Sequence, residues 1–152
     1  MKQVLLAVGG CSGWAAAASE DYLRRLRRWG GVEVIEVRPE PSRGDVEAVK
    51  AAEGRRLLER VGPRDRLVVL DERGVAPTTD AFRDLVVEGL GAEGRLIWAI
   101  GGAFGHAEEV RRRAWRVVRL SSLVLNHDLA RVVLVEQLYR AHTLLHNVPY
   151  HH

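Results

Sequence analysis

Short apolar, β-branched runs alternate along this chain with longer segments of helical periodicity. The runs cover residues 4–8, 32–37, 66–70, 96–100 and 123–125. Strands that alternate with helices are typical of a mostly parallel sheet. The runs 67–70 and 96–100 are apolar at every position, which favours central strands covered by helices on both faces. The sequence therefore predicts an α/β fold.

Helical signals fill the segments between these runs. Residues 45–61 predict a helix interrupted by Gly54. Residues 78–80 supply the N-cap of a further helix, which ends near Gly91, and residues 106–114 predict a fourth helix. The first helix has one apolar face, made by Ala15, Ala18, Tyr22, Leu26 and Trp29.

The last helix, predicted over residues 128–145, has an apolar face wider than one sheet contact needs. Such a face is buried either inside the subunit or against a second subunit, and the residues alone favour the first alternative. The face comprises Val132, Val135, Leu138, Tyr139 and Thr143 or Leu145.

Length and composition predict one domain over residues 1–152, because 152 residues with 47% apolar content suffice for one core. Cys11 is the only cysteine, so no internal disulfide is possible and a reducing compartment is expected. No apolar stretch approaches the roughly 18 residues of a membrane span. We therefore expect a cytoplasmic protein with no membrane partner.

Arginine dominates the basic residues: of 23 Lys and Arg, only Lys2 and Lys50 are lysine. The planar guanidinium suits phosphate recognition, although a genome bias toward arginine is an alternative explanation. The first arginine cluster is the expected RNA-binding group, and it comprises Arg24, Arg25, Arg27 and Arg28. A second arginine cluster lies at residues 111–113.

The last third of the chain carries an ordered set of motifs. A glycine turn at residues 100–105 precedes Ser-Ser-Leu-Val-Leu-Asn-His at 121–127, a patterned helix at 131–141 and a Tyr-His-His end at 150–152. Glycines let the backbone approach a ligand, although such a turn alone is more often structural. The tail has no packing role that the sequence reveals, so it is predicted to be reactive.

This order of motifs, with matching segments at residues 3–9, 21–25 and 67–71, resembles the ribosomal RNA large subunit methyltransferase H family of small bacterial SPOUT-class enzymes. The resemblance implies S-adenosylmethionine as cofactor and methylation of N3 of a pseudouridine in 23S rRNA. It also implies a C-terminal trefoil knot and a homodimer acting on the ribosome. In that dimer the C-terminal helices pack together, which reverses the preference for burial within one subunit.

The family's cofactor pocket maps onto the strand ends, where open α/β sheets bind ligands. This chain departs from the family's pattern at Asn126, where proline is common, and at Ala103, where proline or serine is common. Because backbone groups form the pocket, both changes look tolerable. The pocket residues that the resemblance implies, with the glycines of the turn, are Leu70, Gly101, Gly102, Gly105, Ser121, Ser122, Leu123, Val124, Leu125 and Asn126.

Methylation of an imide nitrogen requires loss of a proton, so a base or a stabilising cation is expected near the pocket. Simpler roles exist for several candidates: His127 could cap a helix, Tyr139 could be core, and Arg140 could pair with Glu136 one turn away. The tail is expected to complete the partner's active site. The candidate catalytic residues are His127, Arg131, Arg140, Tyr150 and His151.

Three rival hypotheses remain. His142 and His146 lie four residues apart on one helix, but no neighbouring carboxylate completes a metal site, so no metal is expected. A non-catalytic RNA- or ribosome-binding factor of the same fold is one alternative function. A flavodoxin-like nucleotide-binding protein is the other.

Overall fold

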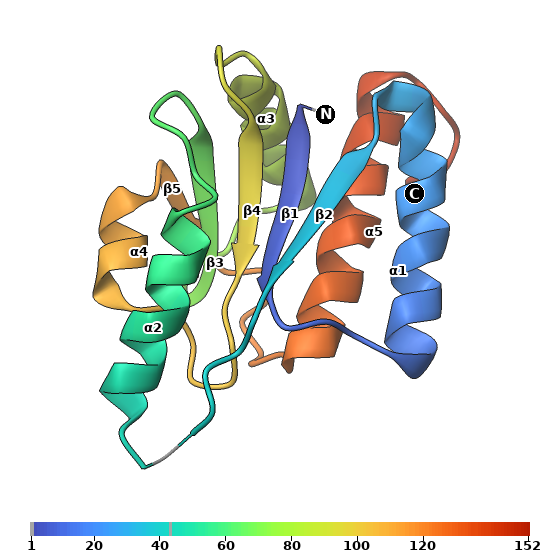
Figure 1. Cartoon of the computed structure of the whole chain (residues 1–152). Helices are drawn as coiled ribbons and strands as arrows, with labels where there is room; N and C mark the ends of the chain where they lie inside the picture. Colours follow the sequence, from blue (N-terminus) through green and yellow to red (C-terminus); the bar gives the residue numbers. More distant parts are fainter. Residues whose placement is uncertain (1, 43) are drawn as a thin grey trace.

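The computed structural model describes residues 2–42 and 44–152. Its described part contains a five-stranded parallel sheet with the order β2-β1-β4-β3-β5, shown in Figure 1. The flavodoxin-like alternative requires the order 2-1-3-4-5 and therefore loses its support. The strands are β1 (Gln3–Val8), β2 (Val32–Val37), β3 (Arg66–Val75), β4 (Leu96–Ile100) and β5 (Arg116–Val118).

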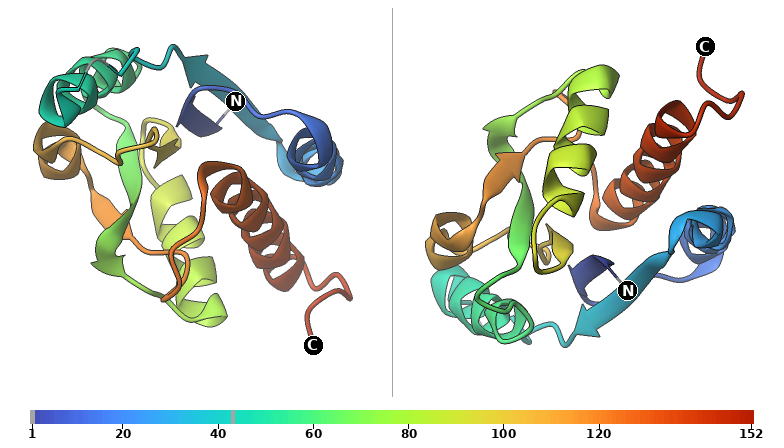
Figure 2. Two further views of the ribbon diagram at one scale, coloured as in Figure 1. Left: turned by 90° about the horizontal axis from the view of Figure 1, so that it is seen from below. Right: turned by 90° about the horizontal axis from the view of Figure 1, so that it is seen from above.

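Helices cover both faces of this sheet, as Figure 2 shows end-on. Alternate strand residues face opposite ways, so Leu5 and Trp98 join the core layer of α5 while Leu6 and Ile97 join that of α2. The layer of α1, α3 and α5 lies opposite that of α2 and α4. The helices are α1 (Gly13–Leu26), α2 (Val46–Leu58), α3 (Thr79–Leu90), α4 (Glu108–Arg113) and α5 (His127–Leu145), and a 3-10 turn, η1 (Arg27–Trp29), follows α1.

Local signals account for most helix ends. Thr78 caps α3 as predicted, with its Oγ1 accepting a hydrogen bond from the Ala81 amide at 3.1 Å, and α3 ends before Gly91. The predicted interruption at Gly54 is wrong, because α2 continues through it. A Cβ there would lie 3.1 Å from Cγ2 of Val110, so this glycine permits close packing of α2 on α4.

The predicted strand at residues 123–125 is also wrong. These residues belong to the loop between β5 and α5, where Leu123 is 77% and Val124 is 82% exposed. The fifth strand is instead the short β5, and Val118 pairs with both Leu70 and Val75 of β3. A Cβ on Gly74 would lie 2.7 Å from the backbone of residues 117 and 118. Glycine therefore lets β3 fold closely over β5.

The α5 helix lies between α1 and α3 (Figure 2), and much of its surface is buried inside the subunit. Val135, Leu138 and Thr143 are buried as predicted, but Leu134 and Ala141 are buried in place of Val132. None of the helices in residues 2–42 and 44–152 has the length and apolarity that a membrane crossing requires.

Candidate functional site

A cleft of about 720 Å³ lies at the carboxyl ends of β3 and β4 and beside the chain that follows β5. This is the edge at which open α/β sheets bind ligands. Nine of the ten predicted cofactor residues line the cleft, and Ser122 is the exception. The nine are Leu70, Gly101, Gly102, Gly105, Ser121, Leu123, Val124, Leu125 and Asn126.

The glycine turn after β4 forms one wall of the cleft. Its ends are joined by a hydrogen bond of 3.1 Å from the Gly105 amide to the Gly102 carbonyl oxygen, and Gly105 has a left-handed φ of 82°. A Cβ on Gly102 would lie 2.5 Å from Oε1 of Glu53. The missing Cβ of Gly102 therefore leaves room for Glu53, and the assignment of Gly102 to the cofactor pocket stays a prediction.

Residues of the loop after β5 also line the cleft. Ser121 Oγ accepts from the Leu123 amide at 2.9 Å, which stabilises the turn between them. Asn126 Oδ1 accepts from the Leu129 amide at 2.8 Å and so caps α5. Asparagine at position 126 thus has a structural role at the start of α5.

Polar side chains that the sequence prediction missed line the floor of the cleft. Arg111 Nη1 donates to Asp71 Oδ2 at 3.2 Å and to the His106 carbonyl oxygen at 2.8 Å. His106 is 3% exposed, and burial lowers its pKa to about 4, so the ring is neutral near pH 7. The only sequence signals were the position of Asp71 directly after the strand predicted at 66–70 and that of His106 directly after the glycine turn.

Three nitrogen atoms of the cleft residues are buried without a hydrogen-bond partner in the described part of the chain. They are Nδ1 of His106, Nε2 of His127 and Nε of Arg119. His127 opens α5, and its Nδ1 lies 3.6 Å from Oδ1 of Asp128. Because buried polar groups rarely stay unpaired, these atoms suit a polar ligand in the cleft.

The predicted catalytic residue Arg131 lies outside the cleft lining. It is 3% exposed, and its guanidinium contacts the carboxylate of Glu36 and the carbonyl oxygen of Gly9. These contacts tie α5 to the ends of β1 and β2. A catalytic role for Arg131 stays a prediction, and its contacts favour a positioning role.

The tail packs on α5 and α1. The Tyr150 hydroxyl donates to Glu136 Oε1 at 3.0 Å and lies 3.1 Å from the Tyr22 hydroxyl, and burial raises the pKa of Tyr150. Arg140 Nη1 lies 3.0 Å from Nδ1 of His151. The expectation that the tail has no packing role is therefore wrong.

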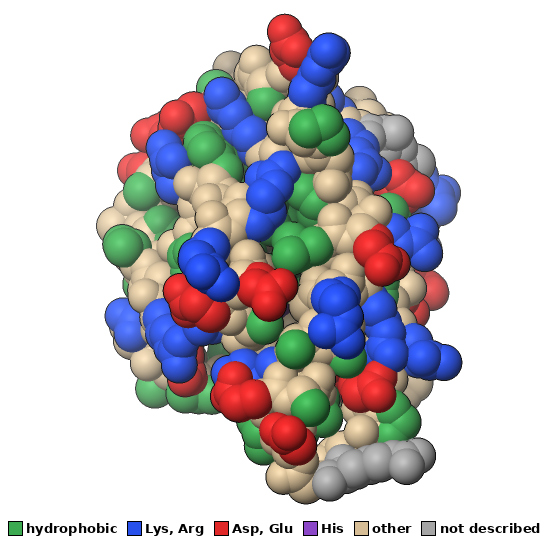
Figure 3. Space-filling model, turned by 60° about the vertical axis from the view of Figure 1, so that its left-hand side comes forward, with side chains coloured by type: hydrophobic (Ala, Val, Ile, Leu, Met, Phe, Trp, Pro, Cys, Tyr) green, Lys and Arg blue, Asp and Glu red, His purple; other side chains and the backbone are tan. Residues whose placement is uncertain are grey.

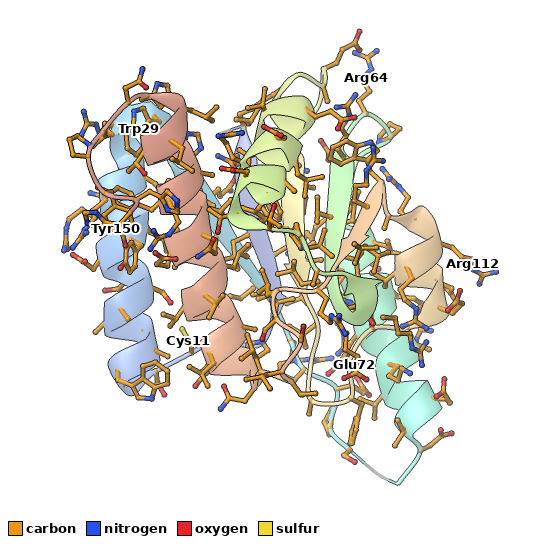
Figure 4. The ribbon with its side chains drawn as sticks, turned by 180° about the vertical axis from the view of Figure 1, so that it is seen from behind. Cys11, Trp29, Arg64, Glu72, Arg112 and Tyr150 are labelled. Atoms are coloured by element: carbon orange, nitrogen blue, oxygen red, sulfur yellow. The ribbon has the colours of Figure 1, made fainter. Side chains whose placement is uncertain are left out.

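This tail cluster is distant from the cleft of its own subunit. Arg140 is 13 residues beyond His127 on α5, which corresponds to about 20 Å of helix. Figure 4 shows Tyr150 over α1 and α5, away from Glu72 of the cleft. Arg140, Tyr150 and His151 thus do not join His127 within one subunit.

The arginines of the first cluster lie in the last turn of α1 and in η1, at the edge of the sheet opposite the carboxyl ends of the strands (Figure 1). Arg24 and Arg25 both pair with Asp21, and the Arg28 guanidinium lies 4.8 Å from the ring centre of Trp29. On the other side, Figure 3 shows basic side chains interspersed with acidic ones. Arg112 of α4 points outward there (Figure 4).

His142 and His146 stack on Trp29, with ring-centre distances of 5.5 and 5.2 Å. The His142 Nε2 accepts from Gln3 Nε2 at 2.9 Å. Within residues 2–42 and 44–152, no cluster of three potential metal ligands occurs.

A family model described as a predicted SPOUT methyltransferase matches residues 1–151. Proteins named ribosomal RNA large subunit methyltransferase H are similar over nearly the whole chain. One from Desulfovibrio desulfuricans is 42% identical over 91% of this chain and 88% of its own length. One from Chromobacterium violaceum is 41% identical over 99% of both.

The chain belongs to this SPOUT methyltransferase family. The match spans residues 1–151 and therefore includes every segment that lines the cleft. Among solved structures, a probable methylase family protein from Haemophilus influenzae aligns with a TM-score of 0.54 at 12% identity. The alignment covers 95% of this chain and 66% of that one, and it supports the fold alone.

Proposed function

We propose that this protein is an S-adenosylmethionine-dependent methyltransferase that methylates N3 of a pseudouridine in 23S rRNA. The observation that carries the proposal is the cleft at the strand ends, in a chain similar over 99% of its length to a protein named ribosomal RNA large subunit methyltransferase H. Its substrate would be the ribosome or its large subunit, and its compartment the cytoplasm.

The cleft fits S-adenosylmethionine in size and chemistry. Its volume of about 720 Å³ lies within the range of roughly 300 to 1,000 Å³ common for small-molecule sites. Leu70 and Leu125 supply apolar wall, while His106 Nδ1 is a buried polar atom without a partner in the described chain. When bound, the cofactor supplies a methyl group activated on a sulfonium. The residues expected to hold it are the predicted pocket residues that line the cleft.

His127 is the candidate proton acceptor of the cleft itself. Its Nε2 is buried and unpaired within the described chain, so no hydrogen bond of the protein competes there with a substrate imide N–H. Arg131, through Glu36 and Gly9, would hold the start of α5 and hence His127 in place. Positioning of the acceptor nitrogen in line with the methyl group would supply much of the remaining catalysis.

A homodimer would reconcile the tail with this chemistry. Because Tyr150 and His151 are far from their own cleft, they would act in the cleft of the partner after leaving their packed positions. Several exposed apolar side chains lie at the cleft end of the subunit and would be covered by a second copy. They are Trp14, Leu123, Val124 and Leu129.

The trefoil knot of the family is part of the same proposal. Its support is local: Val118 pairs with both Leu70 and Val75, and the Arg119 amide donates to the Val75 carbonyl oxygen at 3.1 Å. The chain after β5 would pass through the loop that follows β3.

The decisive experiment uses the full-length protein. Calorimetric titration should detect one S-adenosylmethionine per subunit, and incubation with ribosomes lacking the modification should add one methyl group to a pseudouridine, detected by mass spectrometry. RNA binding without cofactor binding or methyl transfer would favour the non-catalytic factor instead. Methylation of ribosomes but not of free rRNA would indicate recognition of a large preformed surface.

A further inference from the structure

Glu53 is a buried carboxylate directly behind the glycine turn. It lies on the inner side of α2 and is 4% exposed. Glu53 does not line the cleft, whereas Gly102 does. A Cβ built on Gly102 would lie 2.5 Å from Oε1 and 3.1 Å from Oε2 of Glu53. One residue's backbone therefore separates this carboxylate from the cleft.

The carboxylate is only partly compensated. Its Oε2 accepts a hydrogen bond from the Glu40 amide at 3.0 Å, but Oε1 has no partner in the described chain. Of the basic groups on the same helix, Arg56 pairs with Glu40, Arg55 is exposed, and Lys50, which lines the cleft, has its Nζ 3.6 Å from Oε1 of Glu47. A buried carboxylate without a cationic partner is costly.

A ligand in the cleft can supply the missing positive charge. The cofactor named under the proposed function carries a sulfonium cation, whereas the demethylated product, S-adenosylhomocysteine, is a neutral thioether at that position. A carboxylate in a buried, weakly screened position attracts a cation across one peptide more strongly than it would in water. The attraction is lost when the methyl group leaves.

We propose that Glu53 makes the cleft prefer the sulfonium cofactor over its neutral product. Glu53 acts electrostatically through the Gly102 turn, without touching the ligand. This inference rests on the proposed function and assigns to Glu53 the discrimination between cofactor and product, which would speed exchange of spent product for fresh cofactor.

The test is calorimetric titration of the full-length protein and of Glu53→Gln with S-adenosylmethionine and S-adenosylhomocysteine separately. The amide replaces the charge while keeping the side-chain shape. We expect the Kd of the cationic ligand to rise at least about fivefold, by an electrostatic effect, and that of the neutral ligand to change less than about twofold. Glu59→Gln, an exposed position just after α2, is the matched control and should leave the Kd ratio unchanged.

Equal weakening of both ligands would overturn the proposal, because it would mean that Glu53 only supports the turn. An unchanged ratio would overturn it as well. If Glu53→Gln does not fold, Glu53→Asp provides the same comparison, since it retains the charge but withdraws it from Gly102, and the ratio should then fall by about twofold or more. Failure of the unmodified protein to bind either ligand would instead reject the proposed function itself.

Discussion

Arg131 reaches from α5 to Glu36 at the end of β2, with 2.9 Å between Nη1 of the arginine and Oε1 of the glutamate. The side chain of Arg131 is 4% exposed and that of Glu36 is 44% exposed. The pair therefore anchors the start of α5, and with it His127, to the carboxyl edge of the sheet.

Loss of Glu36 should leave the buried Arg131 charge without its partner. We expect Glu36→Ala to lower the free energy of unfolding by about 2 kcal/mol, less than for a fully buried pair because Glu36 is partly exposed. In an Arg131→Met background the same change should cost less than about 0.5 kcal/mol. Urea unfolding of the unmodified protein, the two single variants and the double variant measures the coupling energy between Glu36 and Arg131. Additive changes in the free energy of unfolding would contradict an anchoring pair.

Gly102→Ala should destabilise the protein by about 2 kcal/mol, because its Cβ would overlap Oε1 of Glu53. Adding Glu53→Ala should restore much of that loss by removing the overlap. Gly105→Ala is the matched control: its site is open but has a φ of 82°, so it should lose about 1–2 kcal/mol that Glu53→Ala does not restore. Normal stability with lost cofactor binding in Gly102→Ala would place the Cβ in the cleft after all.

His142 should make stability sensitive to acid. Burial, and then the nearby His146, lowers its pKa from 6.5 to about 4. The unfolded chain therefore takes up a proton below about pH 6.5 that the folded protein does not, so the free energy of unfolding decreases as pH falls, by up to about 1.4 kcal/mol per pH unit.

His142→Phe keeps an aromatic ring against Trp29 but cannot be protonated. Chemical unfolding between pH 6.5 and 5 should show a shallower loss of stability in this variant than in the unmodified protein. His106 retains its own contribution to the pH dependence. The exposed His152→Phe serves as control, and a slope in His142→Phe identical to that of the unmodified protein would mean that His142 does not contribute to acid sensitivity.

Deletion of residues 150–152 should lower the free energy of unfolding by about 1–2 kcal/mol, because Tyr150 loses its packing on Tyr139 and its hydrogen bond to Glu136. Tyr150→Phe keeps the ring and should lose about 1 kcal/mol. Thermal denaturation at matched concentrations measures both. An unchanged melting temperature would mean that the tail contacts contribute nothing.

The same deletion tests the proposed action of the tail across a dimer. Methyl transfer should fall at least about tenfold while cofactor affinity stays the same. Mixing tail-deleted subunits with subunits carrying Ala103→Trp, a substitution at the cleft wall, should recover activity, since one cleft of each heterodimer is then open and served by an intact tail. Absence of recovery would restrict each tail to its own subunit.

The first arginine cluster, in α1 and η1, is predicted to contact rRNA. Replacing Arg24 and Arg27 with glutamine should weaken ribosome binding. The slope of log binding constant against log salt concentration should become shallower by about 0.7–0.9 for each lost phosphate contact. Arg112→Gln on the opposite side of the subunit is the matched comparison. An unaltered salt slope for the variant of Arg24 and Arg27 would mean that these arginines are solvent-exposed and do not contact rRNA phosphates.

Much of the fold was predictable because its signals are local. The apolar runs of β1, β2 and β4 match the strands as predicted, and Thr78 and Gly91 mark the ends of α3. The run at 123–125 misled the prediction, because its apolar residues form an exposed part of the cleft mouth, and burial rather than composition distinguishes a strand from such a loop.

Sequence alone therefore determined the α/β architecture and the position of the glycine turn, since both depend on short-range pattern and on the rule that parallel strands end at one edge. The residues along the cleft were expected from the resemblance to a known family, which the order of motifs along the chain carries. Tertiary structure decided which groups meet. Glu53 and Gly102, Arg131 and Glu36, and Tyr150 and Tyr22 are far apart in the chain, and only the packing of α2, α5 and the tail brings them together. No periodicity encodes such pairs, because long-range contacts depend on how whole elements pack.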